Sequence, residues 1–248
     1  MSAAEPAHRE GGPTVHVGAA SDRGGRLDNE DSYHADGGVY LVADGMGGHA
    51  AGEVASATAV DELAALADGT PDEEDVRIAL RRAHERVRAL PSGGERRPGT
   101  TVSGVVLSRR DGLPCWLVLN VGDSRTYRMV GGVLEQLTTD HSRVAELVAA
   151  GCLDPADAAR HPERHVVTRV LGGGSPEVDP DVFALPVSPT ERIVVCSDGL
   201  SEALPDVRIQ AELRAQADAQ GAADALVGAA LAVGARDNVT VLVVDVLG

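Results

Sequence analysis

The chain has 248 residues, of which 43% are hydrophobic and only 2% aromatic, and its formal net charge is −16. This length fits one large domain or two small ones, with a core built mainly from Ala, Val and Leu. The negative charge disfavours nucleic acid as a partner, because phosphate backbones repel such a surface.

The first third of the chain contains a tail, two strands and two helices. Residues 1–13 are small, polar and aperiodic, so we expect a disordered tail in front of a domain that spans residues 14–248. A strand over 15–20 is followed by a loop rich in charge and glycine over 21–31, and then by a short apolar strand over 39–43. Apolar spacing predicts helices over 52–67 and from Pro71 onwards.

The rest of the chain alternates hairpins with helices. Strands over 100–107 and 115–121 are joined at Asp111-Gly112, which is typical of a hairpin turn, and a second hairpin covers 125–137. We expect further elements in this order: a helix over 142–150, an irregular segment to 165, strands over 178–185 and 192–196, helices within 201–233 and a strand over 239–246. Hairpins with helices on their faces predict an α+β layered domain with mostly antiparallel sheets, although this pattern leaves open whether there is one sheet or two.

Several classes of protein are disfavoured. The three cysteines, Cys115, Cys152 and Cys196, are odd in number and lack the spacing of a disulfide framework or a zinc site. The N-terminal residues lack the apolar stretch of a signal peptide, and no run of about 18 apolar residues occurs that could span a membrane. We therefore expect a cytoplasmic protein without a membrane segment.

Three aspartates lie at the ends of apolar strands. Asp44 and Asp198 each follow a strand and precede Gly, while Asp237-Asn238 comes directly before the last strand. A carboxylate in this place is rigidly held, which suits a hard cation that prefers fixed oxygen ligands. The alternative is a turn, the usual meaning of an isolated Asp-Gly. Asp111-Gly112 provides an internal contrast, because strand patterns flank it on both sides, whereas helical patterns follow Asp44-Gly45 and Asp198-Gly199.

Two other segments carry charged candidates. The loop over 26–31 holds Arg26 together with Asp28, Glu30 and Asp31, and Arg is well suited to clamp a phosphate because its fork binds two oxygens. Asp123 follows another apolar strand. Taken separately, the loop also fits a solvated surface with weak ion pairs, and Asp123 also fits a hairpin turn.

Eight short motifs stand in order along residues 15–247: 26–31, 42–49, 99–101, 121–125, 137–142, 170–172, 196–200 and 237–240. Together they resemble the metal-dependent protein phosphatases, the type 2C Ser/Thr family, in its compact bacterial form. The resemblance implies a four-layer αββα sandwich in which two mostly antiparallel sheets are flanked by helices. It also implies a mobile flap subdomain at about 141–170, which influences substrate choice.

The resemblance assigns roles to individual residues. Two ions of Mn²⁺ or Mg²⁺ are expected, with Asp44 bridging them and the Gly45 carbonyl on the first. Asp198 and Asp237 would hold the second ion, and Asp123 would share a weaker third ion with Asp198. Glu30 would act through water on the metals, Asp31 would support it, and Arg26 would bind the substrate phosphate.

The implied activity is hydrolysis of phosphoserine and phosphothreonine by a metal-activated water, without a phosphoenzyme. Phosphorylated proteins and a Ser/Thr protein kinase would be its partners in bacterial signalling, and the enzyme would be a monomer. Animal members carry His directly after the Asp-Gly, where this chain has Met46, so the group that protonates the leaving alcohol is unassigned, and His49 is only nearby. The open alternatives are a pseudophosphatase that binds phosphoproteins, a phosphatase for small metabolites, and an aspartyl-phosphate enzyme.

Overall fold

The computed structural model describes residues 12–47, 50–92 and 97–247. Nearly all of the expected tail, 1–13, and the whole of His49 lie outside these residues, so the expectations about them stay predictions. Within the described ranges, no helix is long and apolar enough to cross a membrane.

One sheet has five strands, all antiparallel to their neighbours. Their order is β1 (Val15–Asp22), β12 (Val239–Val246), β11 (Arg192–Cys196), β7 (Arg125–Val130) and β8 (Val133–Gln136). The two ends of the chain therefore pair with each other, with Val15 opposite Val246. The β11–β12 core of this sheet is continuous Val, Ile and Leu, because both of its faces are covered.

The second sheet has seven strands and is likewise antiparallel throughout. Its order is β10 (Asp181–Pro186), β6 (Leu113–Val121), β5 (Val102–Arg110), β3 (Val39–Met46), β4 (Gly99–Thr100) and β9 (Leu171–Gly172), with β2 (Asp31–Asp36) also paired to β3. Asp111 and Gly112, which join β5 to β6, have φ values of 52° and 78°, which confirms the predicted hairpin turn.

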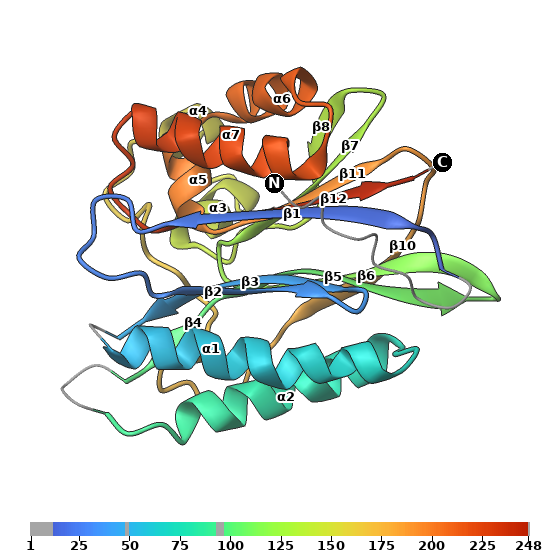
Figure 1. Cartoon of the computed structure of the whole chain (residues 1–248). Helices are drawn as coiled ribbons and strands as arrows, with labels where there is room; N and C mark the ends of the chain where they lie inside the picture. Colours follow the sequence, from blue (N-terminus) through green and yellow to red (C-terminus); the bar gives the residue numbers. More distant parts are fainter. Residues whose placement is uncertain (1–11, 48–49, 93–96, 248) are drawn as a thin grey trace.

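Helices cover the outer face of each sheet, as Figure 1 shows. On the second sheet these are α1 (Ala50–Ala64), its 3₁₀ extension η1 (Ala65–Asp68) and α2 (Glu73–Arg88). On the first sheet they are α5 (Asp198–Ala203), α6 (Asp206–Ala215) and α7 (Ala219–Ala232). The short helices α3 (Arg143–Ala149) and α4 (Pro155–Ala158) belong to the segment between β8 and β9. The predicted four-layer αββα sandwich is confirmed.

Three apolar clusters fill the spaces between the four layers. The central one joins the two sheets through residues such as Val42, Val118, Ile193 and Leu242, all of them inaccessible to solvent. The outer two lie between each sheet and its helices. Burial of this apolar surface fixes the relative position of the sheets, and with it the position of the residues at their edges.

Most predicted elements are present with shifted ends, and two strands, β2 and the two-residue β9, are missing from the prediction. β2 was not predicted because its sequence, Asp31–Asp36, is mostly polar and contains only Tyr33 and Ala35 as a short apolar alternation. The strand predicted over 178–185 begins only at Asp181, directly after Pro180. The strand predicted from residue 100 is interrupted at Thr101, whose amide donates to the Asp44 carbonyl at 2.9 Å.

Candidate active site

Strand ends gather the acidic residues at one end of the sandwich. Asp44 lies near the end of β3 and is the cross-strand partner of Asp31, the first residue of β2. Asp198 is the first residue of α5, two residues after the end of β11, and Asp237 lies two residues before the start of β12. Because β11 and β12 are antiparallel neighbours, the end of one strand lies beside the start of the other. The predicted aspartates therefore share one edge.

Buried hydroxyl groups hold Asp44 and Asp31 in place. The amide of Asp44 donates to Thr101 Oγ1 at 3.0 Å, and Thr100 Oγ1 donates to the Asp44 carbonyl at 2.8 Å. Ser197 Oγ donates to Asp31 Oδ2 at 2.8 Å and accepts from the Thr240 amide at 3.0 Å. Ser197 thus links the two sheets beside the acids, a role that sequence reasoning did not assign to it.

The acids perturb one another strongly. Burial, then repulsion by Asp198, raises the pKa of Asp44 well above its ordinary value. Burial, then repulsion by Asp123, raises the pKa of Asp198 in the same way. Burial raises the pKa of Asp31 to about 6, although hydrogen bonds from Thr240 and Ser197 oppose the effect. A cluster of carboxylates that resists ionisation on its own is a site that binds cations.

The donor set fits divalent cations. Asp31 Oδ1 and Asp198 Oδ1 are shielded from solvent and have no hydrogen-bond partner within the described part of the chain. Both atoms are oxygens, the ligand type that Mg²⁺ and Mn²⁺ prefer. Among the described residues no group of three His, Cys, Asp or Glu side chains could hold an ion alone. Mg²⁺ usually binds proteins through one or two carboxylates and keeps several water ligands, which these acids could provide for.

Gly45 permits a close approach of three chain segments. A Cβ atom at this position would clash with the Gly52 carbonyl group and would lie 2.6 Å from the Glu30 oxygen. The Gly45 amide donates to the Glu30 carbonyl at 3.1 Å, which joins the loop before β2 to β3. The Glu30 side chain lies against the start of α1, because a Cβ atom at Gly52 would be 2.8 Å from the Glu30 carboxyl carbon. Glu30 and Gly45 are thereby brought to the same end as Asp44.

Asn238 fixes the loop that carries Arg26 and Glu30. Its Oδ1 accepts from the Glu30 amide at 2.9 Å, and its Nδ2 donates to the carbonyls of Arg23 and Asp28 at 3.0 and 2.9 Å. This buried side chain uses both ends of its amide on one loop. The sequence analysis includes Asn238 in a motif but predicts no role for it. Its position directly after Asp237 was the feature that could have indicated one.

Arg26 forms an ion pair with Asp237. Its Nη2 donates to Asp237 Oδ2 at 2.5 Å, while the guanidinium side chain remains 56% exposed. The predicted phosphate ligand thus contacts a predicted metal ligand directly. The exposed part of the guanidinium faces solvent and retains donors for a second anion.

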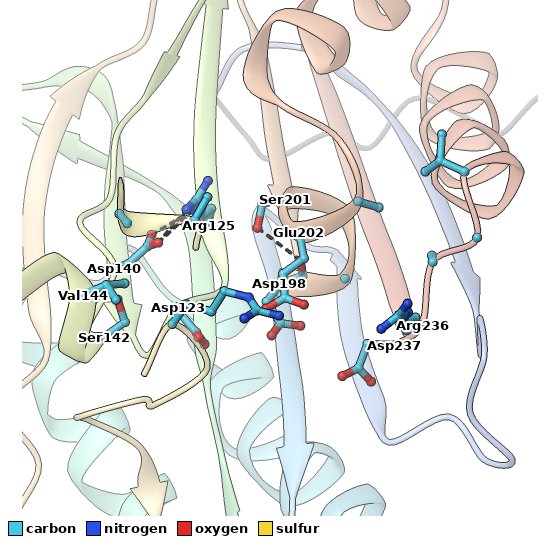
Figure 2. Close-up of a pocket in the computed structure, with 18 of the residues that line it drawn as sticks. Asp123, Arg125, Asp140, Ser142, Val144, Asp198, Ser201, Glu202, Arg236 and Asp237 are labelled. Carbon is cyan, nitrogen blue, oxygen red and sulfur yellow. Dashed lines mark hydrogen bonds and ion pairs between the residues drawn. The ribbon is translucent and has the colours of Figure 1, made fainter. Parts of the chain in front are cut away.

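Asp123 lies in the turn between β6 and β7, in contact with the same acid cluster. Burial, then repulsion by Asp140, raises its pKa to about 6. The neighbouring Arg125 offsets only part of this effect, and it binds Asp140 with both Nε and Nη2, at 2.9 and 2.6 Å. Figure 2 shows Asp198 between Asp123 and Asp237, and both of these carboxylates contribute to the raised pKa of Asp198.

A cavity of about 600 Å³ opens beside these acids. Asp123, Asp198 and Asp237 contribute to its lining, together with the segment 143–166, helix α5 and the loop between α7 and β12. The segment 143–166 leaves the sandwich and returns to it at one place, where Ser142 bridges to Val167 and the Arg143 amide donates to the Val166 carbonyl at 2.8 Å. A concave site with convergent polar groups of perturbed pKa is typical of an active site.

Comparison with known proteins identifies relatives over nearly the whole chain. The sequence profile described as protein phosphatase 2C matches residues 19–231. The serine/threonine phosphatase stp of Listeria welshimeri serovar 6b is 33% identical over 234 residues, which are 90% of this chain and 89% of that protein. The serine/threonine protein phosphatase PstP of Mycobacterium tuberculosis is 38% identical over 243 residues, 94% of this chain but 45% of that protein.

Solved structures agree with the sequence matches. The crystal structure of Mycobacterium tuberculosis PstP/Ppp has a TM-score of 0.83 and 34% identity, covering 94% of this chain and 99% of that one. The PstP catalytic domain in complex with 2 manganese ions has a TM-score of 0.79 at 34% identity over the same 94% of this chain and 99% of that one. The fold, the acid cluster and these matches together show that the chain belongs to the protein phosphatase 2C family.

Proposed function

We propose that this Ser/Thr protein phosphatase removes phosphate from phosphoserine and phosphothreonine with a pair of Mn²⁺ or Mg²⁺ ions held by Asp44, Asp198, Asp237 and the Gly45 carbonyl. The observation that carries the proposal is the group of half-buried, mutually repelling carboxylates at one end of the sandwich, of which Asp198 and Asp237 also line the cavity. Acids whose pKa values are raised first by burial and then by one another are typical of a functional site in a cleft.

The cations and the chain contribute different parts of the reaction. Bound divalent cations supply a water that ionises near neutral pH and neutralise charge on the phosphoryl oxygens. The chain holds the oxygen ligands rigidly, since Asp44 is fixed through Thr101 and Asp31 through Ser197. Glu30 and Asp31 orient water around the ions, and Asp123 with Asp198 holds a weaker third ion.

Arg26 orients the substrate in this proposal. Its guanidinium stands at the edge of the acid cluster, and its donors match two phosphoryl oxygens. Positive charge directed at those oxygens favours the transition state, in which their negative charge is redistributed. Met46 follows Gly45, so the residue directly after the Asp-Gly cannot protonate the leaving alcohol.

The wider setting is also part of the proposal. Substrates would be phosphorylated proteins, including the targets of a Ser/Thr protein kinase, and the enzyme would act as a monomer in the cytoplasm. The segment 143–166, with its short helices α3 and α4, would serve as the flap that influences substrate choice.

Phosphate release from matched phosphopeptides tests the function. We would compare phosphothreonine, phosphoserine and phosphotyrosine versions of one peptide with Mn²⁺, with Mg²⁺ and with EDTA. The proposal expects hydrolysis of the first two only when a divalent cation is present. Asp44→Asn should abolish it, whereas the matched Asp111→Asn, a change in the turn at the far end of the sheet, should leave it intact. Full activity in Asp44→Asn or in EDTA would refute the proposal.

A further inference from the structure

Two arginines line the active-site cavity without an acidic partner. Arg164 comes from the segment 143–166, and Arg236 comes from the loop between α7 and β12. Both are exposed, and neither guanidinium forms an ion pair or hydrogen bond within residues 12–47, 50–92 and 97–247. Their donors are therefore available to a bound anion.

The other arginine of this cavity behaves differently. Arg125 is half-buried and binds Asp140 through two nitrogens, and its Nη1 donates to Tyr127 Oη at 3.0 Å. Arg125 is therefore committed to the structure of the β7 region. In a chain with a formal net charge of −16, uncommitted arginines on an acid-lined cavity call for a function other than ion pairing within the fold.

The structure also supports the positions of both arginines. His165, next to Arg164, contacts Glu202 of α5 through Nδ1 and Oε1 at 2.6 Å, so the flap-like segment is tied to the opposite wall. Arg236 directly precedes Asp237, whose carboxylate accepts from Arg26 and from the Asn238 amide. Figure 2 shows Arg236 beside Asp237 at the end of the cavity. Arg236 thus lies next to the acid cluster, and Arg164 belongs to a segment that contacts α5 on the cavity wall.

We propose that the cavity wall with Arg164 and Arg236 is an anion subsite for side chains that flank the phosphorylated residue, either carboxylates or a second phosphate. This inference rests on the proposed function, because the scissile phosphate is placed at the acid cluster. A peptide bound there passes through the cavity, and guanidinium groups recognise carboxylate and phosphate with two parallel hydrogen bonds. The enzyme would then prefer phosphopeptides with acidic or doubly phosphorylated sequences.

The test compares one phosphothreonine peptide in three versions. Residues on both sides of the phosphothreonine are all Ala, all Glu, or Ala with one additional phosphoserine. We would measure kcat/KM for each with Mn²⁺ and divide it by the value for p-nitrophenyl phosphate, which has no flanking chain. Wild type should favour each anionic version over the Ala version by roughly tenfold, and the preference should shrink at high salt.

Variants assign the preference to the two arginines. Arg164→Gln and Arg236→Gln should each reduce it by about threefold, and the double variant should remove it. The control is Arg160→Gln, an exposed arginine of the same segment that does not line the cavity, and it should leave all ratios unchanged. The Glu and phosphoserine versions separate a carboxylate preference from a phosphate preference.

Peptide binding provides a readout that needs no turnover. In fluorescence anisotropy, wild type should bind the labelled anionic peptides more tightly than the Ala peptide. The double variant should bind all three peptides with equal affinity. If the order is seen in binding but p-nitrophenyl phosphate is not hydrolysed, the proposed function fails and the subsite stands. Equal binding and equal kcat/KM for the three peptides in wild type, or an undiminished preference in the double variant, would overturn the subsite.

Discussion

Arg26 and Asp237, 211 residues apart in sequence, form an ion pair of 2.5 Å at the edge of the acid cluster. Arg26 is the residue that we propose to bind the substrate phosphate, and Asp237 is one that we propose to bind a metal ion. Because a divalent cation competes with the guanidinium for this carboxylate, metal binding would leave more of the Arg26 donors for phosphate. The two roles are therefore linked through one contact.

Replacement of Arg26 tests this link. Arg26→Ala should lower kcat/KM for phosphopeptides by about 10–100-fold, the loss expected for a charge-assisted hydrogen bond to phosphate. The free energy of unfolding of the metal-free protein should change by less than about 1 kcal/mol, because the guanidinium is largely exposed. Steady-state kinetics and urea unfolding measure the two effects. Arg110→Ala, in the hairpin at the far end of the sheet, is the control and should change neither.

Replacement of Asp198 should separate stability from metal binding. Asp198→Asn removes a half-buried charge that its neighbours disfavour, so the metal-free variant should melt at a higher temperature than wild type. Each kcal/mol gained corresponds to roughly 2–4 °C in Tm for a domain of this size. Added Mn²⁺ should raise the Tm of wild type but raise that of the variant much less. Differential scanning calorimetry with and without Mn²⁺ measures both; a lower Tm in the metal-free variant would contradict the account.

The raised pKa of Asp123 predicts a specific pH dependence of stability. Between the ordinary value of 3.8 and about 6, this carboxyl binds more protons in the folded chain than in the unfolded one. The free energy of unfolding therefore falls as pH rises through that window. Between pH 4 and pH 7, the free energy of unfolding of metal-free wild type should fall by about 1–3 kcal/mol relative to that of Asp123→Asn. Above pH 7 the difference between the two proteins should stay constant. Urea unfolding at a series of pH values measures the difference, and parallel curves for the two proteins would exclude it.

Replacement of Ser197 should lower the stability of the fold, although its side chain is small. Ser197→Ala removes the donor to Asp31 Oδ2 and leaves the buried Thr240 amide without its acceptor. A lost hydrogen bond with an unsatisfied buried partner costs about 1–3 kcal/mol, so the unfolding midpoint should fall clearly. Ser92→Ala, at an exposed position in a loop, is the matched control. Chemical denaturation measures both, and equal midpoints would show that Ser197 does not link the sheets as described.

Local sequence pattern predicted an α+β domain with acids at strand ends, the family resemblance supplied the second sheet, and both failed where long-range pairing decides the structure. The apolar strands before Asp44 and Asp198 were visible as runs of Val, Ile and Leu. Strand β2 was not, since its position depends on pairing with β3 and not on its own polar sequence. The contacts of Asn238 with Glu30 and Asp28 span more than 200 residues, and no periodicity within a short window reports them. Arg164 and Arg236 gained meaning only when the structure placed them on one cavity.

Calorimetric titration of the metal-free protein with Mn²⁺ tests the central claim most directly. Wild type and Asp111→Asn should each bind at least two ions, with protons released as the raised pKa values of Asp44 and Asp198 fall on binding. Asp44→Asn should lose this binding while retaining a cooperative unfolding transition. Two ions bound with wild-type affinity by Asp44→Asn would contradict the assignment of the metal centre to these aspartates.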